Sequence, residues 1–305
     1  MNDLDRYASE VVKQKIPAGK FHRLACVRHQ RDRKREGTSQ FSYRLDEDRI
    51  DQFCRFAQQL RHYKGKWSGQ LIELTPIQKF RLGSVVGWVH RKTGLRRFRT
   101  AYNELPRKQG KSLEAAIVAL YITFFDQEAG AEGYTIATKR DQAKIVFNDA
   151  KKLVLSSGLK GRIQVRVSNM HRDSTSSKLE PLGADHDSTD GLNPSLIITD
   201  EFHAHKDRGL IDVMETATGA RSQPLHFQIT TAGNNPVSPC GDQHDYACKI
   251  LERTLVDETF FAIICHADIE DDWKDEATWK KANPHYGVSV NPDDMQSLCR
   301  KAKAM

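Results

Sequence analysis

The 305-residue sequence contains no run of about 18 apolar residues, the length that a membrane-spanning helix needs. Residues 1–6 lack the apolar segment found in secretory signals. The six cysteines are scattered and form no Cys-x-x-Cys pair, which predicts reduced thiols in an intracellular protein and argues against zinc binding. There is also no internal repeat and no low-complexity tract. We therefore expect a globular protein without a membrane span, with one large α/β domain or two small ones.

Positive charge exceeds negative charge, giving a formal net charge of +7 and a pI near 9.0. This balance permits a polyanionic partner. The basic residues gather in two clusters: residues 90–97 form one, and the other consists of Arg28, Arg31, Arg33, Lys34 and Arg35. Such clusters usually form a solvated face, and direct contact with DNA phosphates is the alternative.

The chain is organised around residues 105–112, with the sequence Leu-Pro-Arg-Lys-Gln-Gly-Lys-Ser. Residues 98–103 alternate apolar and polar side chains as a half-buried strand does, and residues 113–120 are good helix formers. Strand, loop and helix are the context of a phosphate-binding loop. In that context the backbone N–H groups bind a polyphosphate, Lys111 reaches its β and γ phosphates, and Ser112 binds Mg²⁺.

This loop motif is incomplete, because Leu105 stands where the usual pattern has a glycine. An ordinary loop before a helix is therefore the alternative, and a second motif is needed. Residues 196–201 form an apolar run that ends in Asp200 and Glu201, which predicts a buried parallel strand with two carboxylates at its C-terminal edge. There Asp200 would hold Mg²⁺ and Glu201 would orient the attacking water. A core strand that ends in a solvated acidic turn is the alternative.

A glutamine precedes the loop. Residues 72–80 resemble the adenine-recognising glutamine motif of helicase-like ATPases, because the Gln78 amide offers both a donor and an acceptor. The same segment predicts a helix start, with Thr75 as N-cap and Pro76 at the first helical position. Both interpretations can hold together.

Downstream patterns predict further strands and helices. The expected strands cover residues 134–137, 225–233 and 259–265, with short strands between 161 and 190, and the expected helices cover residues 46–60, 140–156 and 242–255. The hydroxyls of Thr230 and Thr231 at a strand end suggest a sensor for the phosphate state. His203 and His205 lack a third ligand at a telling spacing, which favours a polar loop over zinc.

Taken together, these motifs resemble the ATPase half of the large terminase subunit, the DNA-packaging motor protein of tailed bacteriophages. The resemblance extends over nearly the whole chain, and the ordered set is far more specific than any one motif. The segments are residues 25–29, 62–67, 74–78, 106–112, 141–147, 190–194, 200–205, 229–233 and 279–284.

The resemblance implies an α/β fold, a P-loop NTPase of the ASCE, RecA-like type with a mainly parallel sheet flanked by helices. It implies a helical, basic N-terminal extension over residues 1–70 that packs on the ATPase, an ATPase domain over 71–267, and the start of a linker over 268–305. The family normally continues into a nuclease domain, and the residues after 267 are too few for one. We therefore expect no nuclease activity, from a truncated chain or an interrupted gene.

The resemblance also assigns roles to site residues. It assigns nucleotide binding to Gln78, Arg107, Lys108, Gln109, Gly110, Lys111 and Ser112. It assigns catalysis to Glu201, Arg107 and Lys111, and it assigns Mg²⁺ binding to Ser112 and Asp200. Coupling of hydrolysis to DNA movement is assigned to Thr230, Thr231 and Gly233. Some relatives supply an arginine in trans at the position that is Asp190 here, so Arg140 and Arg221 are the candidates for that role.

The sequence therefore predicts an ATPase that uses ATP and Mg²⁺ to move double-stranded viral DNA into a procapsid in the host cytoplasm. The expected partners are DNA, the portal protein of the procapsid, the small terminase subunit and further copies in a pentameric ring, whereas the isolated chain would be a monomer. The alternatives are a helicase-like DNA-dependent ATPase, a non-hydrolysing module that docks on DNA or portal, and a small-molecule kinase. A helicase would need a second motor domain after Cys265, and a docking module has no need of Lys111, Asp200 and Glu201.

Overall fold

The computed structural model describes residues 1–183, 191–233 and 235–305, apart from the side chain of Arg140. Its main element is an eight-stranded sheet with the strand order β10-β3-β9-β8-β4-β7-β6-β5. The first six strands in this order pair in parallel, and β6 and β5 are antiparallel additions at one edge. In sequence order the strands are β3 (Thr100–Glu104), β4 (Glu132–Ala137), β5 (Gln164–Val165), β6 (Met170–Arg172), β7 (Ser177–Gly183), β8 (Leu196–Thr199), β9 (Leu225–Thr230) and β10 (Phe260–Ile264).

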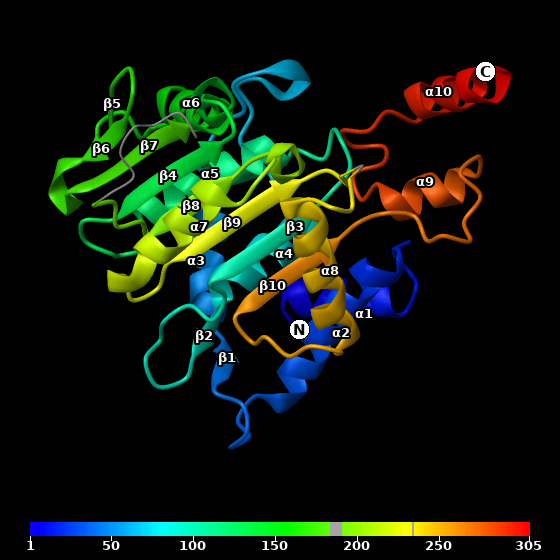
Figure 1. The fold of residues 1–305 in the computed structure, drawn as a ribbon, viewed down its shortest axis with the longest axis horizontal. Coiled ribbons are helices and arrows are strands. Elements are labelled where there is room, and N and C mark those ends of the chain that lie inside the picture. The colour runs from blue at the N-terminus through cyan, green and yellow to red at the C-terminus, as the bar shows by residue number, and fades with distance from the viewer. Residues whose placement is uncertain (184–190, 234) are drawn as a thin grey trace.

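Helices cover both faces of this sheet, with α8 in front of it and α5 behind it in Figure 1. A second, two-stranded antiparallel sheet pairs β1 (Tyr43–Leu45) with β2 (Trp88–His90). The helices are α1 (Asp3–Val12), α2 (Lys20–Arg35), α3 (Glu47–Gln58), α4 (Pro76–Gly87), α5 (Lys111–Phe124), α6 (Arg140–Ser156), α7 (Gly209–Thr216), α8 (Pro239–Glu252), α9 (Glu276–Ala282) and α10 (Pro292–Ala304).

The central strands are buried on both sides; β8 and β10 consist almost entirely of apolar residues, whereas β9 alternates apolar and polar ones. Every residue of β8 and of β10 is buried, and β9 is buried throughout. Such runs are typical of parallel strands that have helices on both faces. The helix α5 is likewise buried almost all round, since it contacts α6 as well as β4, β7, β8 and β9. The predicted fold class, a mainly parallel α/β sheet flanked by helices, is confirmed.

The element boundaries follow local signals. The helix α6 covers the expected residues 140–156, whereas α8 begins at Pro239, three residues before the expected start. The earlier start has a physical reason: the Ser238 side chain caps the helix by accepting a hydrogen bond from the N–H of Gly241, and Pro239 suits the first turn. The strand β9 ends at Thr230, so the expected residues 231–233 lie in the loop beyond it.

The N-terminal helices share one hydrophobic core with the sheet domain. Leu4 of α1 and Phe53 of α3 belong to the same buried cluster as Tyr121 of α5. The rings of Phe53 and Tyr121 make an edge-to-face contact with centroids 5.0 Å apart. In Figure 1 the C-terminal helices α9 and α10 instead extend from the body, at the upper right.

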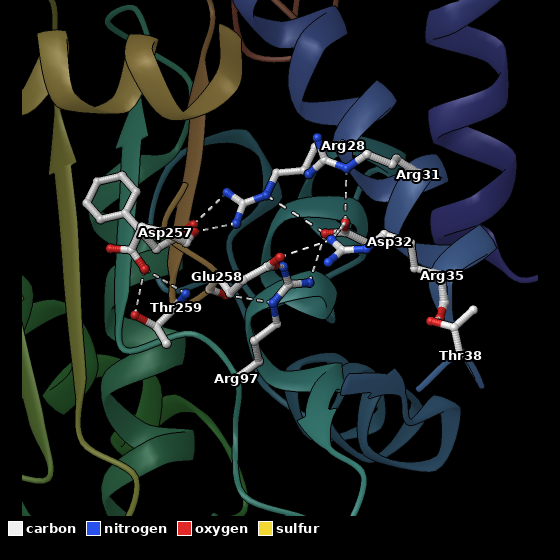
Figure 2. Close-up of polar contacts among 10 residues, drawn as sticks. Arg28, Arg31, Asp32, Arg35, Thr38, Arg97, Asp257, Glu258 and Thr259 are labelled. Carbon is white, nitrogen blue, oxygen red and sulfur yellow. Dashed lines mark hydrogen bonds and ion pairs between the residues drawn. The ribbon is translucent and has the colours of Figure 1, made fainter. Parts of the chain in front are cut away.

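The basic cluster on α2, which begins at Arg28 and ends at Arg35, is largely neutralised by contacts within the fold, as Figure 2 shows. Arg28 donates to the carbonyl oxygens of Phe260 (2.6 Å) and Asp257 (2.8 Å), at the start of β10. The buried Asp32 carboxylate accepts from Arg97 at 2.9 Å, and from Arg31 and Arg35 at 3.3 Å each. Glu258 pairs with Arg35 and Arg97. These arginines therefore join α2 to the edge strand of the sheet, a role that the charge pattern did not indicate.

Candidate nucleotide site

The loop between β3 and α5 has the backbone geometry of an anion site. Gly110 is the N-cap of α5 with φ of 77°, a left-handed conformation that glycine adopts without strain, and no side chain from residues 1–183, 191–233 or 235–305 caps the helix. Lys108 also has a positive φ, of 64°. The N–H groups in the first turn of a helix have no partner within the helix, and the helix dipole favours an anion there. The loop therefore leaves the start of α5 open to a phosphate group.

Lys111 is buried at this helix start, with an exposed fraction of 8%. Its Nζ donates to the carbonyl oxygens of Leu105 (3.0 Å) and Pro106 (2.9 Å), so the side chain folds back over its own loop. Burial lowers the pKa of Lys111, while the nearby charges of Glu201 and Asp200 act in the opposite direction. The ammonium group and the two carboxylates thus share one electrostatic environment.

The two carboxylates follow β8, at the same edge of the sheet as the loop. Asp200 is 6% exposed, and its Oδ1 accepts a hydrogen bond from the N–H of Glu201 at 2.9 Å. Burial and the charge of Glu201 raise the pKa of Asp200 to about 6. Glu201 has φ of 51°, and its side chain is 48% exposed. A buried and an exposed carboxylate therefore lie side by side, with Lys111 as the nearby cation.

The strand β9 separates the loop strand β3 from the acidic strand β8. Parallel strands end at the same edge, so β9 brings Thr230 and Thr231 between the loop and the two carboxylates. Thr230 is fully buried, and its hydroxyl donates to the carbonyl oxygen of Thr231 at 2.8 Å. The insertion of one strand between the phosphate-loop strand and the acidic strand is the ASCE arrangement that we expected.

The residue types at this edge fit a magnesium ion. Mg²⁺ prefers oxygen ligands and binds through one or two protein oxygens together with substrate phosphates and water. Ser112, in the first turn of α5, and Asp200 could supply those oxygens. Within residues 1–183, 191–233 and 235–305, no three His, Cys, Asp or Glu side chains gather into a metal site of their own. A divalent cation would also supply the positive charge that the pair of carboxylates lacks.

His203 joins the predicted catalytic and coupling residues, and the sequence analysis missed it. Its Nδ1 lies 3.2 Å from Oε2 of Glu201 and 3.1 Å from Oγ1 of Thr230. No local sequence signal indicates this contact, because Thr230 is 27 residues away along the chain and approaches through strand pairing.

The predicted helix start is confirmed, since Thr75 is the N-cap of α4 and Pro76 is its first residue, and Gln78 adds a capping contact that was not predicted. Its Oε1 accepts from the N–H of Thr75 at 2.8 Å, and its Nε2 donates to Oε1 of Glu114 at 2.8 Å. Glu114 is fully buried and also pairs with Arg81, which is 1% exposed. This buried network ties α4 to α5 directly beneath the loop. Recognition of adenine by Gln78 stays a prediction.

A C-terminal segment, residues 283–289, lies against the loop, and this contact was also not expected. His285 is 5% exposed; its N–H donates to Oε1 of Gln109 at 3.0 Å, and its Nε2 is 2.8 Å from Oγ1 of Thr75. Asn283 accepts from the Gln109 amide at 3.3 Å, and the Ser289 hydroxyl donates to the carbonyl oxygen of Lys108 at 2.5 Å. The side chain of Gln109 is therefore fully engaged within the protein.

A cavity of about 630 Å³ opens beside the loop, lined among others by Arg107, His203, Thr231 and Asn283. Arg107 is exposed, and its guanidinium makes no polar contact within the part of the chain that the structure describes. It is therefore available to a ligand in this cavity. Gly233, predicted to act in coupling, lies beside the His203 Cβ, since a Cβ built on Gly233 would be 3.5 Å from it.

Of the two arginines predicted to act in trans, Arg221 lies away from the site. Arg221 lies before β9, at the opposite edge of the sheet from the loop, where it donates to the carbonyl oxygens of Asn193 and Gly130 at 2.8 Å each. Arg140 is the first residue of α6, which follows β4. The position Asp190 lies outside the described residues. A role of Arg221 in trans stays a prediction and would require it to leave these contacts.

The strand order, the glycine loop before α5 and the paired carboxylates after β8 define a P-loop NTPase fold. The family model described as terminase large subunit, ATPase domain, matches residues 76–249, and the chain belongs to this family. No helix among the described residues is long and apolar enough to cross a membrane.

Individual proteins are similar to parts of this chain. The crystal structure of the HK97 bacteriophage large terminase is similar with a TM-score of 0.71 and 24% identity, covering 86% of this chain and 52% of that one. "Protein YmfN" of Escherichia coli (strain K12) is 40% identical over 114 residues, which are 37% of this chain and 25% of that protein. The ATPase domain of the Thermus phage P74-26 large terminase is 21% identical, with a TM-score of 0.38 over 48% of this chain and 64% of that one. The chain thus spans about half or less of the length of the first two relatives.

Proposed function

We propose that this chain binds and hydrolyses ATP with Mg²⁺ and that hydrolysis drives the movement of double-stranded DNA into a viral procapsid. The observation that supports this most directly is the meeting of Lys111, Asp200 and Glu201 at one sheet edge, beside an uncapped helix start. A protein that only docks has no physical need to bury a lysine next to two acids, because burying charges is costly.

Each residue has a role in this proposal. The N–H groups at the start of α5 bind the phosphates, and Lys111 leaves its two loop carbonyls to bind the β and γ phosphates. Ser112 and Asp200 would hold Mg²⁺, which neutralises charge that develops on the phosphate oxygens. Glu201 orients the attacking water, and Arg107 approaches the nucleotide from the cavity.

Gln78 and Gln109 would act differently from the other proposed nucleotide-binding residues. The side chain of Gln109 is engaged by residues 283–285, so any contact with the nucleotide would use its backbone N–H. Gln78 would have to release Thr75 or Glu114 before its amide could pair with adenine. Lys108 is exposed, and within the described part of the chain its side chain pairs only with Asp294, at 3.7 Å, so it can turn toward phosphate freely.

The partners follow from the family and are part of the proposal. They are double-stranded DNA, the portal of the procapsid, the small terminase subunit and further copies of the chain in a ring, in the host cytoplasm. An arginine that a neighbour supplies at the γ phosphate can be worth about 10³ to 10⁵ in rate, so the isolated chain would be slow. DNA contact would be mainly to phosphates and therefore weaken steeply with salt.

The test is ATP hydrolysis at increasing protein concentration, with and without double-stranded DNA, beside Glu201→Ala. We expect a rate that depends on Glu201 and rises faster than linearly with concentration, because a neighbouring subunit completes the site. ATP binding without any turnover that depends on Glu201 would contradict the enzymatic function and leave a docking module. A sequence-selective DNA footprint that survives high salt would contradict the proposed mode of DNA contact.

A further inference from the structure

The carboxylate proposed to orient the attacking water is attached to a rigid turn. Glu201 leads into the 3-10 helix η3 (Phe202–Ala204), in which Phe202 is fully buried and the N–H of Ala204 donates to the carbonyl oxygen of Glu201 at 2.8 Å. This turn fixes the backbone of Glu201 but not its side chain, which is 48% exposed. A base on a flexible, exposed side chain needs a further contact to hold it in a productive position.

His203 supplies that contact and connects it to β9. Its Nδ1 lies 3.2 Å from Oε2 of Glu201, 3.1 Å from Oγ1 of Thr230 and 3.3 Å from Oγ1 of Thr231. Its backbone N–H also donates to Oγ1 of Thr230 at 3.1 Å. One side chain therefore touches the proposed catalytic acid and both proposed coupling hydroxyls.

The hydrogen-bond inventory assigns the direction of these contacts. The Thr230 hydroxyl already donates its hydrogen to the carbonyl oxygen of Thr231, so toward His203 it can only accept. An ionised Glu201 carboxylate has no hydrogen to donate and also accepts. Nδ1 of His203 must therefore carry a proton and donate it.

We propose that His203 is a positioning residue for ATP hydrolysis: its Nδ1–H donates to the Glu201 carboxylate, while its backbone N–H donates to Thr230 and so ties the residue to the end of β9. A displacement of this strand end would then move the catalytic carboxylate through a single side chain. The His203 ring is 32% exposed and also lines the cavity beside the loop, together with Arg107. This inference rests on the proposed function, since it assigns Glu201 its role in hydrolysis.

Three substitutions test the donor directly. His203→Asn places an amide N–H close to the position of Nδ1, whereas His203→Gln places it near Nε2, and His203→Ala removes the donor. In the full chain with ATP, Mg²⁺ and double-stranded DNA, we expect His203→Ala and His203→Gln to lower kcat by about 10- to 100-fold, as losses of residues that orient a ligand typically do. His203→Asn should recover most of the rate. The affinity for ATP, measured with a fluorescent ATP analogue, should stay unchanged in all three.

The controls separate this inference from the function on which it rests. In a Glu201→Gln background, His203→Ala should cause no further loss, because the carboxylate that it positions is already absent. Turnover that depends on Glu201 but is unchanged by His203→Ala would overturn the positioning role alone, as would equal losses for the Asn and Gln variants. A loss confined to ATP affinity would overturn it as well. Absence of any turnover that depends on Glu201 would overturn the proposed function and this inference together.

Discussion

Two buried aspartates in this protein have opposite electrostatic surroundings. Burial alone would raise the pKa of Asp32, but the charges of Arg97, Arg28 and Arg31 outweigh it and lower that pKa below its usual value. Burial also raises the pKa of Asp200, and there the adjacent Glu201 adds to the effect instead of opposing it. The arginine network around Asp32 contains its own counter-ions, as Figure 2 shows. At the sheet edge near Asp200, the positive charge of the protein does not compensate both carboxylates.

This difference distinguishes a structural ion network from a binding site. Around Asp32 the charged side chains are compensated by groups of the protein itself, so they stabilise the junction of α2 and β10. At Asp200 and Glu201 the protein does not fully compensate the negative charge of the two carboxylates unless a cationic or metal-bound ligand is present. Carboxylates with pKa values perturbed in this way concentrate at functional sites. Four substitutions test the comparison, from the largest expected effect to the smallest.

Asp32→Asn should have the largest effect on folding. It removes the central negative charge from buried Arg97 and from Arg31 and Arg35, and breaking a buried ion pair from one side typically costs about 3 to 5 kcal/mol. Urea unfolding at pH 7.5 measures the loss. The control is Asp212→Asn, whose carboxylate is 55% exposed and pairs with Arg208, for which we expect about 0 to 1 kcal/mol. Equal losses in both variants would contradict the structural role of the network.

Lys111→Ala should remove activity while leaving the fold nearly intact. Among the residues that the structure describes, Lys111 donates to two carbonyl oxygens of its own loop and to no others, so its loss should reduce stability less than Asp32→Asn does. Loss of a group that stabilises transition-state charge typically costs about 10² to 10³ in kcat. ATP turnover and thermal unfolding are compared with Lys144→Ala, a surface lysine paired with Asp141 at 2.8 Å. Retained turnover in Lys111→Ala would refute the phosphate-loop assignment.

Asp200→Asn should raise stability at neutral pH in the metal-free protein. Because the folded-state pKa of Asp200 is raised to about 6, the folded chain holds this proton more tightly than the unfolded chain does. The stabilising effect of the proton is therefore complete below about pH 4 and is lost as the pH rises through 6, which leaves a cost of about 2 to 3 kcal/mol at pH 7.5. The amide removes this cost.

Urea unfolding in the presence of a chelator checks the sign of that effect. The gain of Asp200→Asn over the unmodified chain should be largest at pH 7.5 and shrink steadily as the pH falls through 6 toward 4, while Mg²⁺-dependent turnover is lost. Asp51→Asn, an exposed position on α3, is the matched control. If Asp200→Asn instead destabilises the protein at pH 7.5, the ionised Asp200 carboxylate stabilises the metal-free fold, which contradicts this prediction.

Lys34→Ala should have the smallest effect. Lys34 belongs to the same basic cluster as Arg31 and Arg35, but it is exposed and makes no ion pair with the described residues. Substitutions at such positions usually change stability by less than about 0.5 kcal/mol. Urea unfolding checks this, and a loss above about 1 kcal/mol would place Lys34 within the network. If Lys34 contacts a DNA phosphate, the slope of the logarithm of the DNA-binding constant against the logarithm of the salt concentration should become shallower by about one unit in Lys34→Ala.

The predicted fold class came from the family resemblance together with local patterns, and the structure confirms it. Continuous apolar runs such as 196–199 identify buried parallel strands, and 140–156 was recognisable as a helix from its length and composition. Boundaries that depend on caps, such as Ser238, shifted by a few residues. The role of the basic cluster was not predictable, because opposite charges such as Glu258 lie more than two hundred residues away from Arg35.

The sequence by itself determined which chemical groups stand at strand ends: a glycine before Lys111 and Ser112, two acids after an apolar strand, and two hydroxyls after another. Their placement at one edge follows from parallel pairing alone. Only the tertiary structure decided that His203 bridges Glu201 and Thr230, that residues 283–289 cover the loop, and that Arg28 and Arg97 are buried. The physical reason is that periodicity and turn signals are local, whereas these contacts join segments that meet only after the sheet has formed.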